Sequence, residues 1–295
     1  MNRFDGPLTQ EDYEEPRCLL NMDRPGEECH RKTIDMRRVM EKLDEYQARK
    51  DYAGAERHLE FWLGEARLGN DKRGEFAVRG EQIGFYRKRG EEEKCFACVA
   101  EALRLMKELD YEDGISGATC WVNCGTAAQA FGRYGQAMEW FEKARAIYEK
   151  DLDGADARLG GLYNNMALTL VSEGRFESAR QCYEKALDVM EQVPGGAPER
   201  AITLLNMANA AESELGLEAA EGTIEELLDK AEWLLDSCDP REHAELADYI
   251  APGYYAFVLE SCAPTFSYYG YFLAAKKFSE RAEEITKELS LTEYS

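Results

Sequence analysis

A compact apolar or small side chain recurs at near-constant intervals along most of this chain, each time inside an amphipathic helical pattern. The positions are Leu43, Ile83, Gly125, Ala167 and Ala208, and their separations are 40, 42, 42 and 41 residues. Unrelated amphipathic helices would drift from such a spacing, so its constancy over five copies indicates an internal repeat. One short repeat cannot bury its own apolar face, and the copies must therefore stack. The sequence predicts an all-α protein, an α-solenoid of about six helix-turn-helix repeats.

The two clearest copies begin at Trp121 and Tyr163 and run for about 27 residues each. Their apolar and small residues recur at the three- and four-residue spacing of a helix face. A glycine followed by arginine and an aromatic residue interrupts each pattern, at Gly132 and Gly174. Glycine is the strongest local signal for a turn, so each copy is expected to be two helices with a tight corner.

The remaining units are less regular. The solenoid is expected over 33–290, between an irregular arm at 1–32 and a tail at 291–295, with units near 34–68, 75–108, 117–152, 160–192, 201–237 and 241–289. Thr33 is expected to cap the first helix. The fifth corner, near Gly216, is expected to hold about four extra residues. In the sixth unit Pro252 and Pro264 are expected to break helices, and a final helix should cover 268–289.

These patterns resemble the tetratricopeptide repeat, whose first helix carries an aromatic residue, Leu-Gly and Tyr, and whose second carries Ala and an aromatic residue. The matching residues in the two clearest copies are Trp121, Gly125, Ala137 and Phe141, then Tyr163, Ala167, Ala179 and Tyr183. Cys124 and Ala128 stand where the family has Leu and Tyr. The pitch of about 42 residues resembles the long variety found in kinesin light chains. The resemblance implies a right-handed superhelix whose concave wall, made by the first helices, binds peptides or protein segments.

Charge narrows the class of partner. The chain carries 36 basic and 58 acidic residues, a net charge of −22. A nucleic-acid partner needs a concentrated positive surface, so nucleic acid is not expected. No stretch approaches the roughly 18 apolar residues of a membrane span, so no membrane partner is expected either. The nine cysteines, an odd number, and the absence of a secretory pattern favour a reducing, cytoplasmic location.

An asparagine row is the first candidate binding feature. We count residues from the recurring small position of each first helix. If that position faces the partner helix, the residues at −3, +1, +4 and +5 line the concave wall, and the residue at −2 lies at the edge of the wall. Asn123, Asn165 and Asn206 occupy the −2 position, and Asn164 and Asn209 lie beside them. An amide both donates and accepts, so such a row could bond the backbone of an extended peptide. Alternatively, the asparagines tie neighbouring first helices together.

Basic residues are the second candidate feature. Arg87 and Lys88 fall on the wall of the second unit and Arg37 on that of the first, where they could clamp an acidic side chain or a terminal carboxylate. Together with Glu212 further along the groove, they would orient a peptide. The alternative is ordinary solvated charge.

The last unit is rich in aromatic residues: Tyr249, Tyr254, Tyr255, Phe257, Phe266, Tyr268, Tyr269, Tyr271, Phe272 and Phe278. Terminal repeats are atypical because they must cover the exposed end of the core, so capping is the first interpretation. The alternative is a contact surface for a partner or for a second copy of the chain, which would make a homo-oligomer.

Catalytic and metal chemistry finds little support. Cys95 and Cys98 form a CxxC, but no second pair accompanies it and Cys95 falls where the repeat needs a small residue. Cys29 and His30 have no evident orienting group. We expect no cofactor, no metal and no catalytic site. The favoured function is a non-catalytic protein- or peptide-binding scaffold, and the alternatives are a receptor for a small peptide signal or, third, a Cys/His enzyme.

Overall fold

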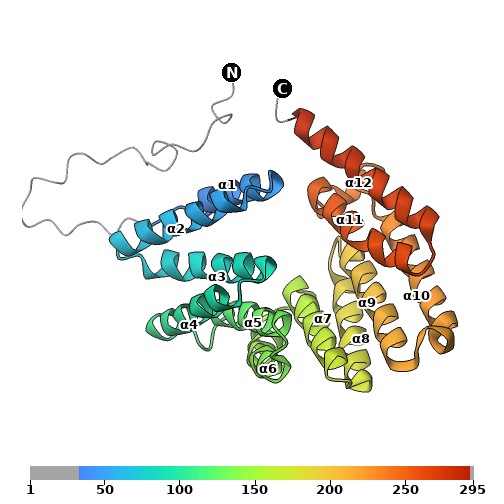
Figure 1. The fold of residues 1–295 in the computed structure, drawn as a ribbon, viewed down its shortest axis with the longest axis horizontal. Coiled ribbons are helices and arrows are strands. Elements are labelled where there is room, and N and C mark those ends of the chain that lie inside the picture. Colours follow the sequence, from blue (N-terminus) through green and yellow to red (C-terminus); the bar gives the residue numbers. More distant parts are fainter. Residues whose placement is uncertain (1–32, 293–295) are drawn as a thin grey trace, which may run out of the picture. The chain divides into compact units, whose positions relative to one another are not determined.

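The structure, a computed structural model, describes residues 33–292, and regular structure there is entirely helical. It holds twelve α-helices, paired in chain order into six hairpins that we number 1 to 6 (Figure 1). The first helices are α1 (Met36–Ala48), α3 (Lys72–Arg89), α5 (Ile115–Ala130), α7 (Ala157–Ser172), α9 (Ala197–Leu215) and α11 (Pro252–Tyr268). The second helices are α2 (Tyr52–Leu68), α4 (Glu92–Glu108), α6 (Tyr134–Asp151), α8 (Phe176–Gln192), α10 (Leu217–Ser237) and α12 (Phe272–Thr292). The expected all-α solenoid class is confirmed.

The chain divides into two compact units, Met1–Glu75 and Phe76–Ser295, and the boundary falls inside α3. The first unit contains hairpin 1, where Val39, Leu43, Ala55 and Leu59 are buried between α1 and α2. Its first helix is capped by Asp35, whose carboxylate accepts hydrogen bonds from the backbone N–H groups of Arg37 and Arg38. The expectation that Thr33 caps this helix was wrong, because a carboxylate one residue before the helix reaches its free N–H groups.

Close helix approach within the second unit explains the small residues of the repeat. Gly125 on α5 lies against the ring of Phe141 on α6, and a β-carbon at Gly125 would overlap that ring. Phe141 and Ala137 are fully buried. Small residues on one helix thus let a large one on its partner fill the space between them, as close packing requires.

Three of the corners share a glycine with nearly the same positive φ. Gly90, Gly132 and Gly174 have φ of 70°, 73° and 71°, a conformation that glycine adopts without strain. In hairpin 5, α9 continues to Leu215 and Gly216, with φ of 82°, directly precedes α10. The four extra residues expected at this corner are not there. Ala208 and the fully buried Ala220 are 12 residues apart, as Gly125 and Ala137 are, so hairpin 5 keeps the register of the others.

Hairpin 6 departs from the expectations most. Pro264 does not break a helix: it lies inside the continuous helix α11, on an exposed position. Pro252 instead begins α11, at a position where its missing N–H costs nothing. The last helix starts at Phe272 rather than at residue 268, because residues up to Tyr268 belong to α11.

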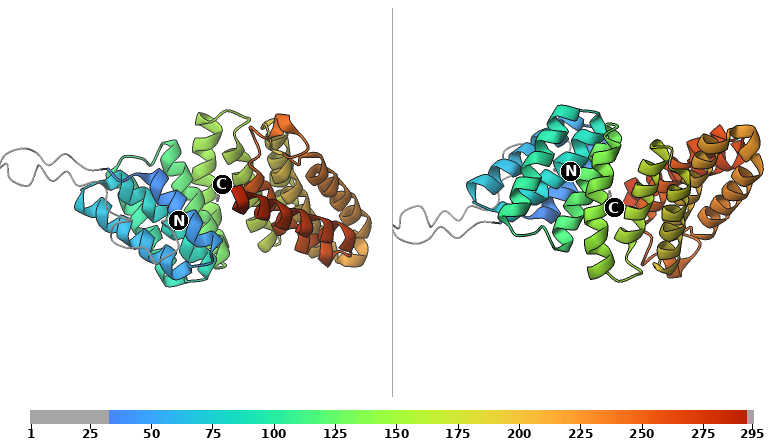
Figure 2. Two further views of the ribbon diagram at one scale, coloured as in Figure 1. Left: turned by 90° about the horizontal axis from the view of Figure 1, so that it is seen from above. Right: turned by 90° about the horizontal axis from the view of Figure 1, so that it is seen from below.

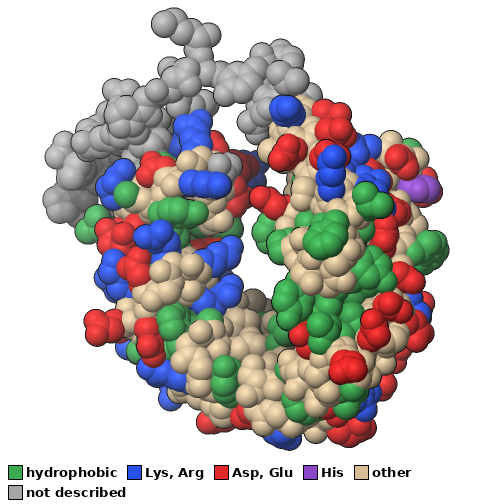
Figure 3. All heavy atoms as spheres, turned by 45° about the vertical axis from the view of Figure 1, so that its right-hand side comes forward, with side chains coloured by type: hydrophobic (Ala, Val, Ile, Leu, Met, Phe, Trp, Pro, Cys, Tyr) green, Lys and Arg blue, Asp and Glu red, His purple; other side chains and the backbone are tan. Residues whose placement is uncertain are grey.

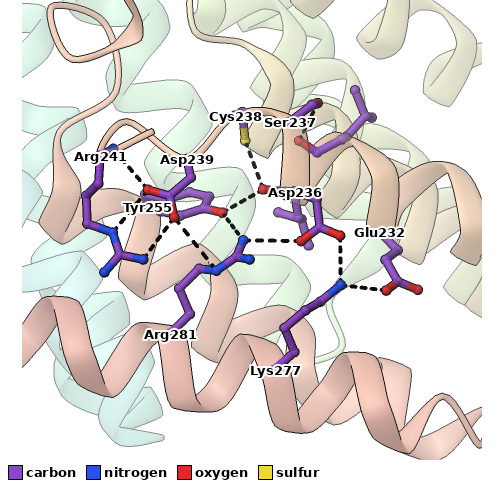
Figure 4. A network of polar contacts seen from close by, with 11 residues as sticks. Glu232, Asp236, Ser237, Cys238, Asp239, Arg241, Tyr255, Lys277 and Arg281 are labelled. Carbon is purple, nitrogen blue, oxygen red and sulfur yellow. Dashed lines mark hydrogen bonds and ion pairs between the residues drawn. The ribbon is translucent and has the colours of Figure 1, made fainter. Parts of the chain in front are cut away.

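A polar network fastens hairpin 6 to α10 (Figure 4). Asp239, fully buried in the connection after α10, accepts hydrogen bonds from Nε and Nη2 of Arg241 at 3.1 and 2.9 Å and lies 3.7 Å from Nε of Arg281 on α12. Arg281 also contacts Asp236 at 3.2 Å and donates to the Tyr255 hydroxyl at 3.0 Å. Lys277 bonds Glu232 and Asp236 at 2.7 Å each. These contacts join α10, α11 and α12 where the connecting segment, with a short 3-10 helix at Ala244–Leu246, is longer than elsewhere.

Candidate functional site

The first helices of the second unit form one wall. α5 closely approaches α7, α7 approaches α9 and α9 approaches α11 (Figures 1 and 2). In the described part of this unit consecutive second helices do not approach each other as closely, and α10 and α12 meet through the long side chains of Lys277 and Arg281. Because the first helices lie closer together, the array curves toward them. We call this surface, made by α3 from Phe76 onward, α5, α7, α9 and α11, the inner wall.

Side chains of the asparagine row take part in joining these helices. The Asn206 amide on α9 donates to Oδ1 of Asn164 on α7, at 3.2 Å. The −2 position of one first helix therefore faces the −3 position of the preceding one. In the same way Gln129 on α5 donates to the backbone carbonyl of Asn165, at 3.5 Å. For Asn164 and Asn206 the geometry thus matches the alternative that the asparagines tie neighbouring helices together.

Two asparagines of the row keep their amides free. Asn123 and Asn165 are half-buried, and neither side chain makes a hydrogen bond with any described residue. Asn123 lies beside Gly80 on α3, where a β-carbon would be 3.6 Å from its Nδ2. Since Gly80 has no side chain to cover it, the Asn123 amide stays open on one side. These two amides are the ones able to bond an incoming backbone.

The far end of the row is closed by tyrosines. Tyr269 donates to Oδ1 of Asn209 at 3.0 Å and to Glu212 at 2.8 Å, and Tyr268 donates to Glu212 at 2.7 Å. The hydrogen bond to the Glu212 carboxylate is the main reason why the pKa of Tyr268 is raised. The pKa of Tyr269 is raised mainly by burial and secondly by its hydrogen bond to Glu212. Asn209 and Glu212 therefore connect α9 to the end of α11. We did not expect these partners from the sequence, because only the fold brings residues about 57 positions apart together.

The three basic candidates belong to two different units. Arg87 is half-buried and Lys88 exposed at the end of α3, and neither makes an ion pair with a described residue. Arg37 is exposed on α1, where its Nε lies 3.9 Å from Glu41. Arg37 belongs to the first unit and Arg87 to the second. Arg87 and Lys88 therefore supply positive charge that no described acidic side chain neutralises by an ion pair.

The aromatic residues of hairpin 6 divide between the two interpretations. Tyr255, Phe266 and Phe278 are fully buried and close the end of the core. Phe257 is 61% exposed and Tyr268 67% exposed on α11, and hydrophobic side chains gather over these C-terminal hairpins in Figure 3. Phe257, Pro264 and Tyr268 recur at helical spacing on one open side of α11. Tyr268 reaches Glu212, so this side continues the inner wall.

The cysteines of α4 belong to the core. Burial raises the pKa of Cys95 to about 11, so its thiol stays protonated near neutral pH. Its Sγ donates to the Ile83 carbonyl at 3.5 Å, and Sγ of Cys98 lies 3.6 Å from Oε1 of Gln82. Over residues 33–292, no group of three His, Cys, Asp or Glu side chains is placed to hold a metal. Cys29 and His30 lie outside the described residues.

Comparison with known proteins agrees with this geometry. The BtubC (BKLC) structure from P. vanneervenii superposes with a TM-score of 0.52 at 17% identity, covering 82% of this chain and 92% of that one. Kinesin light chain TPR-like repeats from Podosopora anserina give 0.55 at 17% identity, covering 68% and 95%. A Rap protein complexed with competence and sporulation factor gives 0.54 at 18% identity, covering 86% of this chain and 64% of that one. No curated protein sequence matches.

None of the described helices is long and apolar enough to cross a membrane. At the identities found, the solved structures show the fold alone. The family is shown by the sequence: the model of the tetratricopeptide repeat matches residues 77–150 and 158–232, about half of the chain. With its helical hairpins, its positive-φ corners and this match, the chain belongs to the tetratricopeptide-repeat family.

Proposed function

We propose that this chain is a non-catalytic scaffold that holds an extended protein or peptide segment against the inner wall. The observations that carry the proposal are the open amides of Asn123 on α5 and Asn165 on α7, and the charges of Arg87 and Lys88 on α3, which form no ion pair with a described residue. Amides at one repeat spacing can bond successive parts of a backbone, and the cations favour an acidic group at the α3 end. An acidic segment that runs from α3 toward α11 would meet polar groups first and the aromatic side of α11 last.

The partner is thus expected to carry its acidic residues at one end and apolar residues at the other. Phe257, Pro264 and Tyr268 offer apolar surface at the α11 end. Large aromatic side chains contribute much of the binding energy in protein interfaces. The negative net charge of the chain disfavours acidic segments elsewhere on its surface, which makes the α3 end selective.

The seven described cysteines are free thiols, which supports a reducing compartment, and we place the scaffold in the cytoplasm. Hydrogen bonds within the protein occupy Asn164, Asn206 and Asn209, so we assign them to positioning the wall and not to direct contact. Neither nucleic acid nor membrane is part of the proposal.

A peptide array tests the proposal. Fluorescent peptides of about 12 residues, with acidic residues at the N-terminal, C-terminal or neither end, are titrated against the protein and read by anisotropy. Replacing both Arg87 and Lys88 by Ala should weaken binding of the acidic peptides by about tenfold or more, since charge-assisted hydrogen bonds contribute about 1.5–3 kcal/mol. Asn165→Ala should weaken acidic and neutral peptides alike.

Arg104→Ala is the matched control, because Arg104 is a surface cation on the second helix α4 that pairs with Glu101 and Glu108. It should leave binding unchanged. Equal losses for Arg104→Ala and for the Arg87/Lys88 double variant would show that only net charge matters and would refute the inner wall as the site.

A receptor for a short free peptide is the second candidate, favoured by the fold shared with the Rap protein that carries competence and sporulation factor. The two functions differ in what is bound. Mass spectrometry of the protein purified from its own host should find a folded protein partner for the scaffold, and a free short peptide for the receptor.

A further inference from the structure

A groove runs between α11 and α12 on the side of hairpin 6 that faces away from hairpin 5. Its volume is about 570 Å³, and it is lined by Glu260 on α11 and by Ser279, Ala282, Glu283, Thr286 and Lys287 on α12. Lys277 and Arg281, which contact α10, lie on the opposite side of α12, because successive helical residues are rotated by about 100°. Ser279, Glu283 and Thr286 are exposed, so the groove is open.

The register of the repeat identifies what such a groove receives. Counted from the small position Ala263, Ser279 is residue +16 of hairpin 6 and is equivalent to Tyr183 of hairpin 4. Tyr183 belongs to a buried cluster against which Met207 and Ala210 of α9, the next first helix, are packed. In hairpins 1 to 5 the +16 residue is always buried: Leu59, Val99, Phe141, Tyr183 and Ile224. The α11–α12 groove therefore lies where the array receives one more first helix.

The lining of the α11–α12 groove is polar where the interior of the array is apolar. At +20 the other hairpins have leucine or, in hairpin 3, arginine, and at +23 they have the buried residues Ala66, Met106, Tyr148, Met190 and Ala231. Hairpin 6 has Glu283 and Thr286 at these two positions. Neither Glu283 nor Glu260 makes an ion pair with a described residue. A helix that enters the groove must therefore bring cations, because covering an unpaired carboxylate is costly.

The tie between α7 and α9 indicates which residue of an incoming helix meets Glu260. Asn206, at −2 of α9, donates to Asn164, at −3 of α7. Glu260 is at −3 of α11, so it faces position −2 of a helix packed in the same way. A Lys or Arg at that position would pair with its carboxylate.

The corner of hairpin 6 supplies an apolar contact at one end of the groove. Phe272 is residue +9, equivalent to Phe176 of hairpin 4. Phe176 and Leu215, at the end of α9, line one common pocket. Phe272 is 67% exposed, so an apolar residue at the C-terminal end of an incoming helix would cover it.

The charge of hairpins 5 and 6 favours a cationic partner over a second copy of this chain. Residues 197–292 contain 19 acidic and 7 basic side chains. Their field attracts a cationic helix and repels another molecule with the same excess of negative charge.

We propose that the α11–α12 groove binds a cationic amphipathic α-helix of another protein, packed as a first helix is. Lys or Arg of this helix faces Glu260 and Glu283, and an apolar residue near its C-terminus contacts Phe272. The site is separate from the inner-wall contacts of Arg87 and Lys88 and does not depend on them.

The probe is a fluorescein-labelled peptide of 19 residues, the length of α9, titrated with the full chain and read by anisotropy. It is built on alanine and glutamine, with a hydrocarbon staple on one face. The other face carries three lysines at spacings of three and four residues and a leucine near the C-terminus. A second peptide has glutamates in place of the lysines, and a third has the lysines but two central prolines that prevent a helix. The wild type should bind only the first.

Charge exchange locates the site. Replacing both Glu260 and Glu283 by Gln should weaken binding of the lysine peptide about three- to tenfold, the range for two partly exposed ion pairs. Replacing both by Lys should reverse the preference, so that the glutamate peptide binds and the lysine peptide does not. Both positions are exposed, and circular dichroism checks that each variant is folded. If the lysine variant is not folded, the glutamine variant decides.

Two controls separate the α11–α12 groove from net charge and from the inner wall. Replacing Glu218 and Glu221, exposed on α10, by Gln removes the same charge and should leave binding unchanged. Replacing Arg87 and Lys88 by Ala should also leave it unchanged.

The proposal is overturned if the wild type binds the glutamate or proline peptide as tightly as the lysine peptide. It is also overturned if the Glu260 and Glu283 variants bind as the wild type does, or if the Glu218/Glu221 control loses as much affinity as the glutamine variant. A wild-type dimer in analytical ultracentrifugation that dissociates when Glu260 and Glu283 are replaced by Lys would equally refute it, because a second copy then occupies the groove.

Discussion

Asp239 is the residue whose replacement should separate hairpin 6 from the rest of the array. Its carboxylate is fully buried between Arg241 and Arg281 (Figure 4). Asp239→Asn keeps the shape but removes the charge that both guanidinium groups face. Breaking a buried ion pair from one side costs about 3–5 kcal/mol. The lower end applies here, because Arg281 keeps Asp236 at 3.2 Å and Arg241 can turn to Glu284, 3.9 Å away.

A loss of about 3 kcal/mol raises the population of the locally open state by roughly 100-fold. In a repeat array each hairpin contacts only its neighbours, so the opening should stay at the end of the chain. Amide hydrogen exchange is the assay. We expect faster exchange throughout α11 and α12 and unchanged exchange in α7 and α8. Glu226→Gln, which removes an exposed ion pair with Lys230 on α10, is the control and should change nothing measurable.

The same variant tests the pH dependence. Burial acts to raise the pKa of Asp239, but the hydrogen bonds and charges of Arg241 and Arg281 outweigh it, so the folded-state pKa lies below its ordinary value. A carboxylate with a lowered pKa contributes stability that is present above its unfolded pKa, about 4, and lost as the pH falls through the folded value. The exchange difference between wild type and Asp239→Asn should therefore shrink on acidification below pH 4. A uniform effect on all hairpins, or a difference that grows in acid, would refute the reasoning.

The remaining predictions concern backbone positions; the glycine substitutions are measured by thermal or urea unfolding and the proline substitution by amide hydrogen exchange. Gly125→Ala should destabilise the protein by about 1–3 kcal/mol, because its β-carbon meets the Phe141 ring, whereas Gly135→Ala, with open space around it in α6, should stabilise it by about 0.5–1 kcal/mol. Equal effects of the two substitutions would contradict the packing argument. Pro264→Ala should slow exchange in α11 by restoring a helical N–H that proline lacks, since proline inside a helix costs about 3 kcal/mol relative to alanine. Unchanged exchange around residue 260 would count against that account.

The spacing of small residues was enough to predict the fold class, because packing a helix pair requires Gly125 or Ala167 opposite a large residue whatever the surroundings. The same spacing led to wrong helix bounds for hairpin 6. The small position of hairpin 6, judged by its corner at Gly270, is Ala263, 55 residues after Ala208. A search at the interval of 40–42 residues that separates the other small positions misses Ala263. Without that register, Pro264 is wrongly interpreted as a helix break.

Binding residues were harder to predict than packing residues. Asn123, Asn165 and Asn206 look identical in sequence, because each lies two residues before a small position. What separates them is the residue on the preceding helix: Asn164 accepts from Asn206, while Gly80 leaves Asn123 uncovered. That neighbour is about 42 residues away, and only the stacked structure shows which pairs meet. The Asp239 network was missed for the same reason.

The side-chain hydrogen bonds that join the first helices also determine where the second unit deforms when it is stretched. Asn206 to Asn164 and Tyr269 to Asn209 act as ties along the inner edge between α7 and α11, so stretching that edge must break them. Asn123 has no such tie beside Gly80. Hairpins 2 and 3 are instead joined through α4, where Arg133 donates to Glu92 at 2.7 Å. An incoming segment that needs a wider groove is therefore expected to separate the inner edges of α3 and α5 before those of α7, α9 and α11.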